Sequence, residues 1–260
     1  MTMFKSLKDR VDSYIVFWGG IALLTRDIVR DMIRFPIAWR QTYEQIYLIG
    51  VKSTPLVLIT ALSTGMVMAL QYGLGLEKFG GKLYVPKLVA TTVLREMGPV
   101  FTSLMLAARV GAGIASELGS MVVTQQIDAI RALGTSPIQK IVIPRVLGLL
   151  ICLPILVAIT NVIANIGGLI VGVNELGLNS EYYVQKIHST VNLSDYLSGF
   201  GKSFFFALFI ALPACYTGLR VENGTREVGM ATTNAVVISS ILILVGDFFL
   251  TKFFWIIQRW

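Results

Sequence analysis

Three charged residues interrupt an otherwise apolar stretch, residues 88–116, and they are the first candidates for chemistry. They are Arg95, Glu96 and Arg109. An arginine suits a phosphate, because its planar guanidinium donates two parallel hydrogen bonds. The adjacent Arg95 and Glu96 have two readings: a mutually neutralising pair near lipid headgroups, or part of a substrate path, which ionisable residues inside a membrane mark by default. On the second reading Arg95 binds a phosphate while Glu96 holds its guanidinium in position.

Other residue types that often carry chemistry do not form a site here. Gly201-Lys202-Ser203 resembles the end of a phosphate-binding loop, but position 196 is Tyr rather than Gly and the segment opens an apolar run. His188 has no suitably spaced partner, and we expect it to be exposed. Cys152 and Cys215 both lie in apolar runs, which argues against a disulfide framework and a His/Cys metal cluster. We expect no catalytic residue, metal or bound cofactor.

Composition identifies the solvent in which these residues act. The chain has 260 residues, of which 55% are hydrophobic and 14% charged, whereas soluble domains carry about 25% charged residues. A chain of this size cannot hide that much apolar surface from water. The natural solvent is therefore a bilayer, and the net charge of +7 fits anionic lipid better than nucleic acid.

We expect an all-α membrane protein with about five transmembrane helices, since a span needs roughly 20 mostly apolar residues. The stretch with three charges should insert only with the help of neighbouring helices. Lys202 and Arg220 flank one short candidate and should snorkel to the interface. The predicted spans are Ser53–Leu76, residues 88–116, Val146–Asn174, Ser203–Leu219 and Val228–Gly246.

The N-terminal segment, residues 1–45, differs from the transmembrane domain at residues 46–260. Its apolar run Ser13–Thr25 is too short to span and is surrounded by basic residues. A signal peptide is excluded, because Asp9 and Asp12 precede the run and no small-x-small cleavage site follows. We predict an amphipathic helix lying in the membrane interface. Lys and Arg are more frequent on the N-terminal side, so the N-terminus is predicted to be cytoplasmic and the C-terminus to lie on the opposite face.

A short polar helix is predicted after the second span. Thr124 can cap its start and Gly134 can end it, and Ile127, Ile130 and Leu133 recur every three residues between them. The helix is too short and too polar to cross a membrane. It is either a solvated loop helix or a docking helix that enters a groove on a partner.

Small residues recur every four positions in two of the spans. Such faces let helix backbones approach closely, either within one chain or across a homodimer seam. They are Ala108, Ala112 and Ser116, with Gly111 and Ala115 alongside, and Ala164, Gly168 and Gly172.

Several of these runs together resemble one family, the MlaE (YrbE-type) permease subunits of ABC transporters that move phospholipids between the two membranes of Gram-negative envelopes. The dense match covers roughly residues 90–155. The runs are Leu94-Arg95-Glu96-Met97-Gly98-Pro99, Ala108-Arg109-Val110-Gly111-Ala112, Glu117-Leu118-Gly119-Ser120-Met121, Gln126-Ile127-Asp128-Ala129-Ile130 and Pro144-Arg145.

The resemblance implies a homodimer in the inner membrane with a periplasmic C-terminus, which helps maintain outer-membrane lipid asymmetry. It also implies a separate cytoplasmic ATPase that binds ATP and Mg, a STAS-domain subunit and a periplasmic hexamer of MCE-domain subunits. Two positions depart from the family pattern at the presumed ATPase contact, Gln125 in place of Glu and Ser136 in place of Asp.

The resemblance further implies roles for individual positions. The lipid-binding residues would be Met68, Gln71, Leu76, Phe79, Arg95 and Glu96. The ATPase-coupling residues would be Gln126, Ile127, Asp128, Ile130, Arg131 and Leu133. The dimer seam would contain Ala108, Gly111, Ala112 and Ala115.

The sequence therefore predicts a phospholipid permease that is not itself an enzyme. The main alternative is a secondary transporter of an amphipathic substrate in which Glu96, Glu117 or Asp247 relays protons. A membrane enzyme acting on lipids is disfavoured, because the spans contain no plausible nucleophile–base pair.

Overall fold

The computed structural model describes residues 2–34, 36, 38–222 and 224–257 as helices joined by short turns, with no strand in that part of the chain. Residue 1 and residues 258–260, the outer limits of the two predicted segments, lie outside the description. Five helical stretches are long and apolar enough to cross a membrane, which confirms the predicted fold class. They are Trp39–Glu77, Lys82–Val123, Ile138–Asn174, Leu193–Leu219 and Thr225–Ile257.

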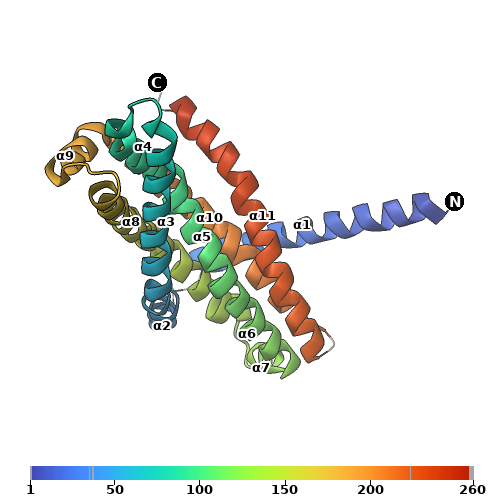
Figure 1. The fold of residues 1–260 in the computed structure, drawn as a ribbon. Helices are drawn as coiled ribbons and strands as arrows, with labels where there is room; N and C mark the ends of the chain where they lie inside the picture. The colour runs from blue at the N-terminus through green and yellow to red at the C-terminus, as the bar shows by residue number, and fades with distance from the viewer. Residues whose placement is uncertain (1, 35, 37, 223, 258–260) are drawn as a thin grey trace.

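Helix α1 (Thr2–Arg34) lies within the predicted N-terminal segment and extends beyond its apolar run Ser13–Thr25 in both directions. It runs crosswise to the spanning helices and carries the N-terminus far from them (Figure 1). Ile21, Leu24 and Ile28 are buried against the bundle, and their spacing places them on one helix face. That face anchors the C-terminal half of α1, while its position in a membrane interface stays a prediction.

The first stretch joins α2 (Trp39–Ile49), η1 (Val51–Ser53) and α3 (Thr54–Glu77). Helix α3 packs closely on α8 (Ile143–Asn174). A Cβ atom at Gly65 would collide with the backbone carbonyl oxygen of Ala164, so the two backbones touch there. One predicted small-residue face is thus used for packing within the chain.

The second stretch is interrupted at its charged residues by two π-helical segments. It consists of η2 (Lys82–Tyr84), α4 (Val85–Thr92), η3 (Val93–Met97), α5 (Gly98–Leu106), η4 (Ala107–Gly111) and α6 (Ala112–Val123). Arg95 and Glu96 lie in η3 and Arg109 in η4. Such one-turn irregularities re-aim side chains and are frequent at functional sites. Arg109 donates to the backbone oxygen of Lys52, so this charge finds a neighbour, as predicted.

The remaining helices complete the bundle and define its two ends. Helix α7 (Gln126–Ala132) and the turn between α10 (Leu193–Leu219) and α11 (Thr225–Ile257) lie at what we term the α7 end. Helix α9 (Ser180–Thr190) lies at the opposite, α9 end (Figure 1). Segment η5 (Ile138–Val142) leads from α7 into α8.

Helix α10 begins ten residues before the predicted start of its span at Ser203. Asn192 and Asp195 form a capping box at its N-terminus, which satisfies backbone N–H groups that the helix itself leaves unpaired. The extra turns bring Lys202 inside the bundle. The prediction that Lys202 snorkels to the interface is therefore wrong, because its side chain is fully buried.

The α3–α8 contact predicts opposite effects for two glycines of the same helix. Gly65→Ala should destabilise the protein by about 1–3 kcal/mol, because the new methyl group overpacks a backbone contact. Gly75 has open space around its Cβ position, so Gly75→Ala should be neutral or stabilising by up to about 1 kcal/mol. Thermal unfolding in detergent measures both, and equal midpoints for the two variants would contradict the close contact.

Candidate functional site

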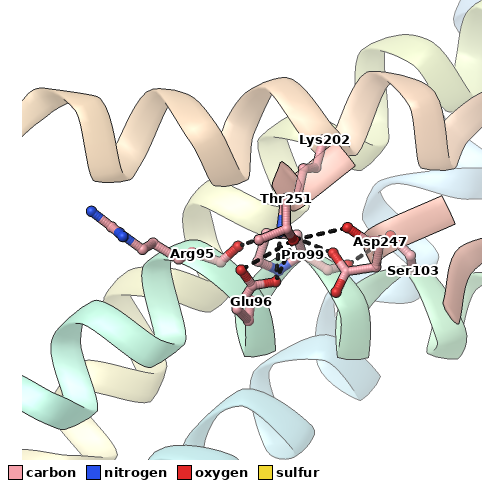
Figure 2. A network of polar contacts seen from close by, with 7 residues as sticks. All are labelled: Arg95, Glu96, Pro99, Ser103, Lys202, Asp247 and Thr251. Carbon is pink, nitrogen blue, oxygen red and sulfur yellow. Dashed lines mark hydrogen bonds and ion pairs between the residues drawn. The ribbon is translucent and has the colours of Figure 1, made fainter. Parts of the chain in front are cut away.

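A buried ammonium group forms the centre of a polar cluster between η3, α10 and α11. Lys202 Nζ of α10 donates to Glu96 Oε2 at 2.5 Å and to Asp247 Oδ1 at 2.9 Å. It also contacts Thr251 Oγ1 at 2.7 Å and the backbone oxygen of Arg95 at 3.1 Å. Figure 2 shows these groups converging on the Lys202 side chain. An ammonium has three N–H donors, so the four oxygen atoms compete for them.

The backbone explains why one of these acceptors is available. Pro99 has no N–H, so it cannot donate the helical hydrogen bond that the carbonyl of Arg95, four residues earlier, would otherwise accept. Lys202 Nζ donates to that carbonyl instead. The proline thus positions a backbone acceptor toward the cluster, while Ser103 Oγ donates to the oxygen of Pro99 at 2.7 Å.

The side chain of Arg95 points away from this cluster (Figure 2). Its Nε donates to Asp195 Oδ1 at 2.6 Å, and Nη2 contacts the same carboxylate. Asp195 is 3% exposed and also accepts from the backbone N–H of Asn192 at the start of α10. The predicted pairing of Arg95 with Glu96 is therefore wrong: adjacent residues point to different sides of a helix, and each finds a partner on α10.

Burial makes the cluster electrostatically demanding. Its three charged side chains are two carboxylates and one ammonium, and Lys202 is 0% exposed. Removing a charge from water costs several kcal/mol, which is offset only by good geometry and additional hydrogen bonds. Thr251 supplies one such bond, since its hydroxyl lies 3.3 Å from Glu96 Oε1 and 2.8 Å from the backbone oxygen of Asp247.

A cavity of about 570 Å³ opens beside the cluster. Its wall combines the two carboxylates with an exposed cation and large apolar side chains, so it offers both kinds of surface to an amphipathic ligand. The lining residues are Glu96, Met97, Leu244, Asp247, Phe248, Thr251, Lys252 and Trp255.

The structure brings only part of the predicted lipid set to this cavity. Glu96 lines it, whereas Met68 and Leu76 pack against a small second core between α3, α4 and α8. Gln71 is exposed, and Phe79 is 84% exposed in the turn after α3. A lipid role for these four residues stays a prediction.

Helix α7 presents most of its side chains outward. Ile127 is buried and Ile130 partly buried, so they hold the helix against the bundle. Gln126 is exposed, the exposed Asp128 and Arg131 form an ion pair of 3.1 Å, and Leu133 is 81% exposed. These exposed side chains leave one face of α7 accessible to a partner, and the docking role stays a prediction.

The predicted C-terminal end of α7 is confirmed, whereas the predicted N-cap is wrong. Gly134 has φ +73° and follows the last turn, as expected for a terminating glycine. Thr124 is not the N-cap, because its hydroxyl donates back to the oxygen of Ser120. Gln125 takes the N-cap position with φ 59°.

The predicted dimer-seam residues do not share one surface. Ala115 is fully buried beside Gly218 of α10, and Gly111 faces Ile210 of the same helix. Ala108 is exposed and Ala112 partly exposed. Only these two have surface left for a second copy, and the seam stays a prediction.

Sequence reasoning missed several partners of the site. The sequence places Lys202 at the interface without a partner and gives no signal for Asp195 or Thr251. The sequence suggests a role for Asp247 only in the alternative function, as a proton relay. Lys202 and Asp247 each border a long apolar run, which indicates that both lie near the membrane-spanning part. The sequence does not indicate which charged residues form ion pairs. His188 is exposed, as predicted, and both cysteines are buried and free.

Comparison with known proteins covers nearly the whole chain. A family model described as Permease MlaE matches residues 42–253. A probable ABC transporter permease protein of Rickettsia conorii is 39% identical over 236 residues, 91% of each chain. The intermembrane phospholipid transport system permease protein MlaE of Haemophilus influenzae is 33% identical over 90% of this chain and 89% of its own length.

A plant relative is also similar. Protein TRIGALACTOSYLDIACYLGLYCEROL 1, chloroplastic, of Arabidopsis thaliana is 30% identical over 91% of this chain and 68% of its own length. The family match includes Glu96, Lys202 and Asp247 as well as α7.

The charge cluster predicts that Lys202→Met is strongly destabilising while a triple variant recovers. Removing the ammonium alone leaves two partly exposed carboxylates side by side without a cation, which should cost up to about 3–5 kcal/mol, the loss typical of a broken buried pair. Lys202→Met combined with Glu96→Gln and Asp247→Asn removes all three charges and should restore much of the folded yield. Lys252→Met, an exposed lysine of the same cavity wall, is the matched control. Unfolding midpoints and folded yield in detergent are measured, and a single Lys202→Met variant as stable as wild type would contradict this account.

Proposed function

The chain belongs to the MlaE permease family, and on that premise we propose that it is the permease subunit of an ABC transporter that moves phospholipids between the inner and outer membranes. A separate ATPase subunit hydrolyses ATP, with ATP and Mg bound there and no cofactor on this chain. The protein named MlaE in Haemophilus influenzae is an intermembrane phospholipid transport permease, which supports phospholipid as the substrate class.

The observation that carries this proposal is the cavity beside the charge cluster. Its wall places Glu96 and Asp247 next to Leu244 and Phe248 on helices that can cross a membrane. A phospholipid needs both surfaces at once, since its headgroup is charged and its chains are apolar. A bare apolar groove would not distinguish a substrate from any lipid of the surrounding bilayer.

The proposed orientation places the α7 end in the cytoplasm of a Gram-negative cell and the α9 end in the periplasm. The N-terminus is then cytoplasmic and the C-terminus periplasmic, in the inner membrane. Basic residues favour this arrangement, because Arg131, Lys140 and Arg220 lie near the α7 end while the buried Lys202 no longer counts for the other face. Helix α7 then faces the ATPase.

The proposed assembly contains two copies of this chain, the ATPase, a STAS-domain subunit and a periplasmic hexamer of MCE-domain subunits. Maintenance of outer-membrane lipid asymmetry is the proposed role of this assembly. Nothing in the cluster or in α7 requires nucleic acid.

One observation favours a second candidate, a proton-coupled secondary transporter. Glu96 and Asp247 share a single buried cation, and paired carboxylates inside a membrane are typical of proton relays. The third relay candidate, Glu117, instead accepts from the buried Arg145 at 2.7 Å. Reconstitution into liposomes with the ATPase separates the two functions: ATP-dependent lipid transfer supports the proposal, whereas transfer driven by a pH gradient without ATP contradicts it.

Arg95 does not line the cavity beside the charge cluster. We propose that it binds a lipid phosphate at a separate point, with the part of its guanidinium that Asp195 leaves exposed, its side chain being 46% exposed. Arg95→Ala should lower co-purified phospholipid and transport about tenfold, as expected for a lost charge-assisted hydrogen bond. Arg95→Lys should rescue only partly, because a point charge cannot reproduce the planar fork.

A double variant separates phosphate binding from a structural role. Arg95→Ala alone leaves the buried Asp195 unpaired, whereas adding Asp195→Asn removes that charge. If Arg95 binds phosphate, the double variant still lacks lipid. Wild-type lipid content in the double variant, measured by native mass spectrometry, would show that the pair is structural.

For α7 we predict that Arg131→Glu leaves the permease folded but lowers stimulation of the ATPase at least tenfold. The reversal puts an acid at position 131 on the same helix face as Asp128, so this face carries two negative charges and no positive one. Like-charge contact with a partner can cost several kcal/mol. Lys78→Glu, an exposed reversal after α3, is the matched control at the other end of the bundle. Normal co-purification together with unchanged ATPase activity in the Arg131 variant would remove the docking role.

A further inference from the structure

A hydrogen bond ties the crosswise helix α1 to the loop that follows α7. Ser136 Oγ donates to Asp31 Oδ2 at 2.7 Å, across 105 positions of sequence. A second, longer bond runs beside it, from Gln139 Nε2 to the backbone oxygen of Pro36 at 3.4 Å. The C-terminal half of α1 is therefore fastened to the loop by polar contacts as well as by its apolar face.

Ser136 joins three pieces of structure with one hydroxyl. Its O–H donates to Asp31. Its oxygen accepts from the backbone N–H of Gln139, in the first turn of η5, at 3.4 Å. A serine in this position caps a helix start. The same hydroxyl thus contacts α1 on one side and the first turn of η5 on the other, at the end of the α7 loop.

Asp31 pairs with Ser136 rather than with a neighbouring basic side chain. Arg30 and Arg34 flank it on α1, yet within the described residues no ion pair joins Asp31 to a basic side chain. Its carboxylate turns toward the loop and is partly buried there. A hydrogen bond to a charged acceptor is stronger than one between neutral groups, so this contact outweighs the more exposed alternatives.

Apolar packing continues the connection to α7. Ile28 of α1, Ile127 of α7 and Ile141 of η5 belong to the same buried core, and Met32, Ile130 and Ile138 pack against it. When the backbone of α7 shifts, the loop and α1 must follow or this core opens. A shift of α7 without α1 would also break the hydrogen bond between Ser136 and Asp31.

We infer that Asp31 and Ser136 are positioning residues that make α1 and the α7 loop move as one unit. This inference rests on the proposed function, because it assigns the unit to the transmission of force between the ATPase and the membrane-spanning helices. Neither residue contacts the lipid cavity, and neither lies on the exposed face of α7. They act by holding α7 in the orientation that the ATPase meets.

A double-mutant cycle tests the contact in the complete complex with the ATPase. We expect Asp31→Ala and Ser136→Ala each to lower permease-dependent ATPase stimulation about tenfold, the factor that a hydrogen bond to a charged group typically contributes. The double variant should be no worse than either single one, because both remove the same bond. Ser136→Thr keeps the hydroxyl and should restore stimulation, and Asp31→Asn keeps an acceptor oxygen and should restore part of it.

Thr124→Val is the matched control in the same region. It also removes a hydroxyl beside α7, but that hydroxyl bonds only within its own chain segment, to the oxygen of Ser120. Wild-type stimulation is expected there. Co-purification of the ATPase and the unfolding midpoint are measured for every variant, so that a loss of assembly is not read as a loss of positioning.

The outcomes separate this inference from the proposed function. Unchanged stimulation in both single variants, additive losses in the double variant, or no rescue by Ser136→Thr would overturn the inference even where ATP-dependent lipid transfer is intact. A wild-type complex whose ATPase is stimulated but moves no phospholipid would contradict the proposed function, while a non-additive cycle in the same complex would still support the positioning contact.

Discussion

The ammonium of Lys202 inside the membrane-spanning bundle is the constraint on which the rest of the structure depends. An unpaired charge there is too costly to keep, so η3 and α11 must each bring an oxygen within hydrogen-bonding distance of α10. This requirement determines how far η3, α10 and α11 are shifted along the bundle axis relative to one another. Apolar packing determines this less sharply, because a shift by one helical turn would break all the hydrogen bonds to Lys202 at once. It also places carboxylates on the wall of a cavity that Lys252, Thr251 and large apolar residues line as well.

Backbone features make that arrangement reachable. Pro99 leaves the carbonyl of Arg95 without its helical donor, and η3 adds the local irregularity that lets Glu96 face the cluster while the Arg95 side chain turns to Asp195. At the other side of the bundle, Gly65 allows α3 to touch the backbone of α8. Each device depends on a missing group: the absent N–H of Pro99 frees a backbone acceptor for Lys202, and the absent side chain of Gly65 lets two backbones touch.

The sequence was sufficient for the features that depend on local composition. Five apolar runs predict five spanning helices, Gly134 predicts the end of α7, and charges inside the second stretch predict that neighbours must satisfy them. The sequence could not predict which charged residues form ion pairs with one another. Arg95 and Glu96 are adjacent, so a local reading joins them, whereas their partners lie about 100 residues away on α10. Lys202 was misplaced for a related reason: the capping box at Asn192 lengthens α10 and moves an apparent helix-end lysine into the interior.

Helix α10 is the element that both polar regions share. Lys202 lies toward its start in the charge cluster, and Tyr216 lies fourteen residues later, about 21 Å along the helix at 1.5 Å per residue. The Tyr216 hydroxyl donates to the backbone oxygen of Val16 on α1 at 3.3 Å, and a Cβ at Gly20 would collide with the same side chain. Helix α1 is in turn bonded through Asp31 to the α7 loop. Helix α10 therefore contacts the charge cluster toward its start and α1 toward its end, with Pro213 between the two contacts, so one helix connects the cavity wall to the helix that holds the α7 loop.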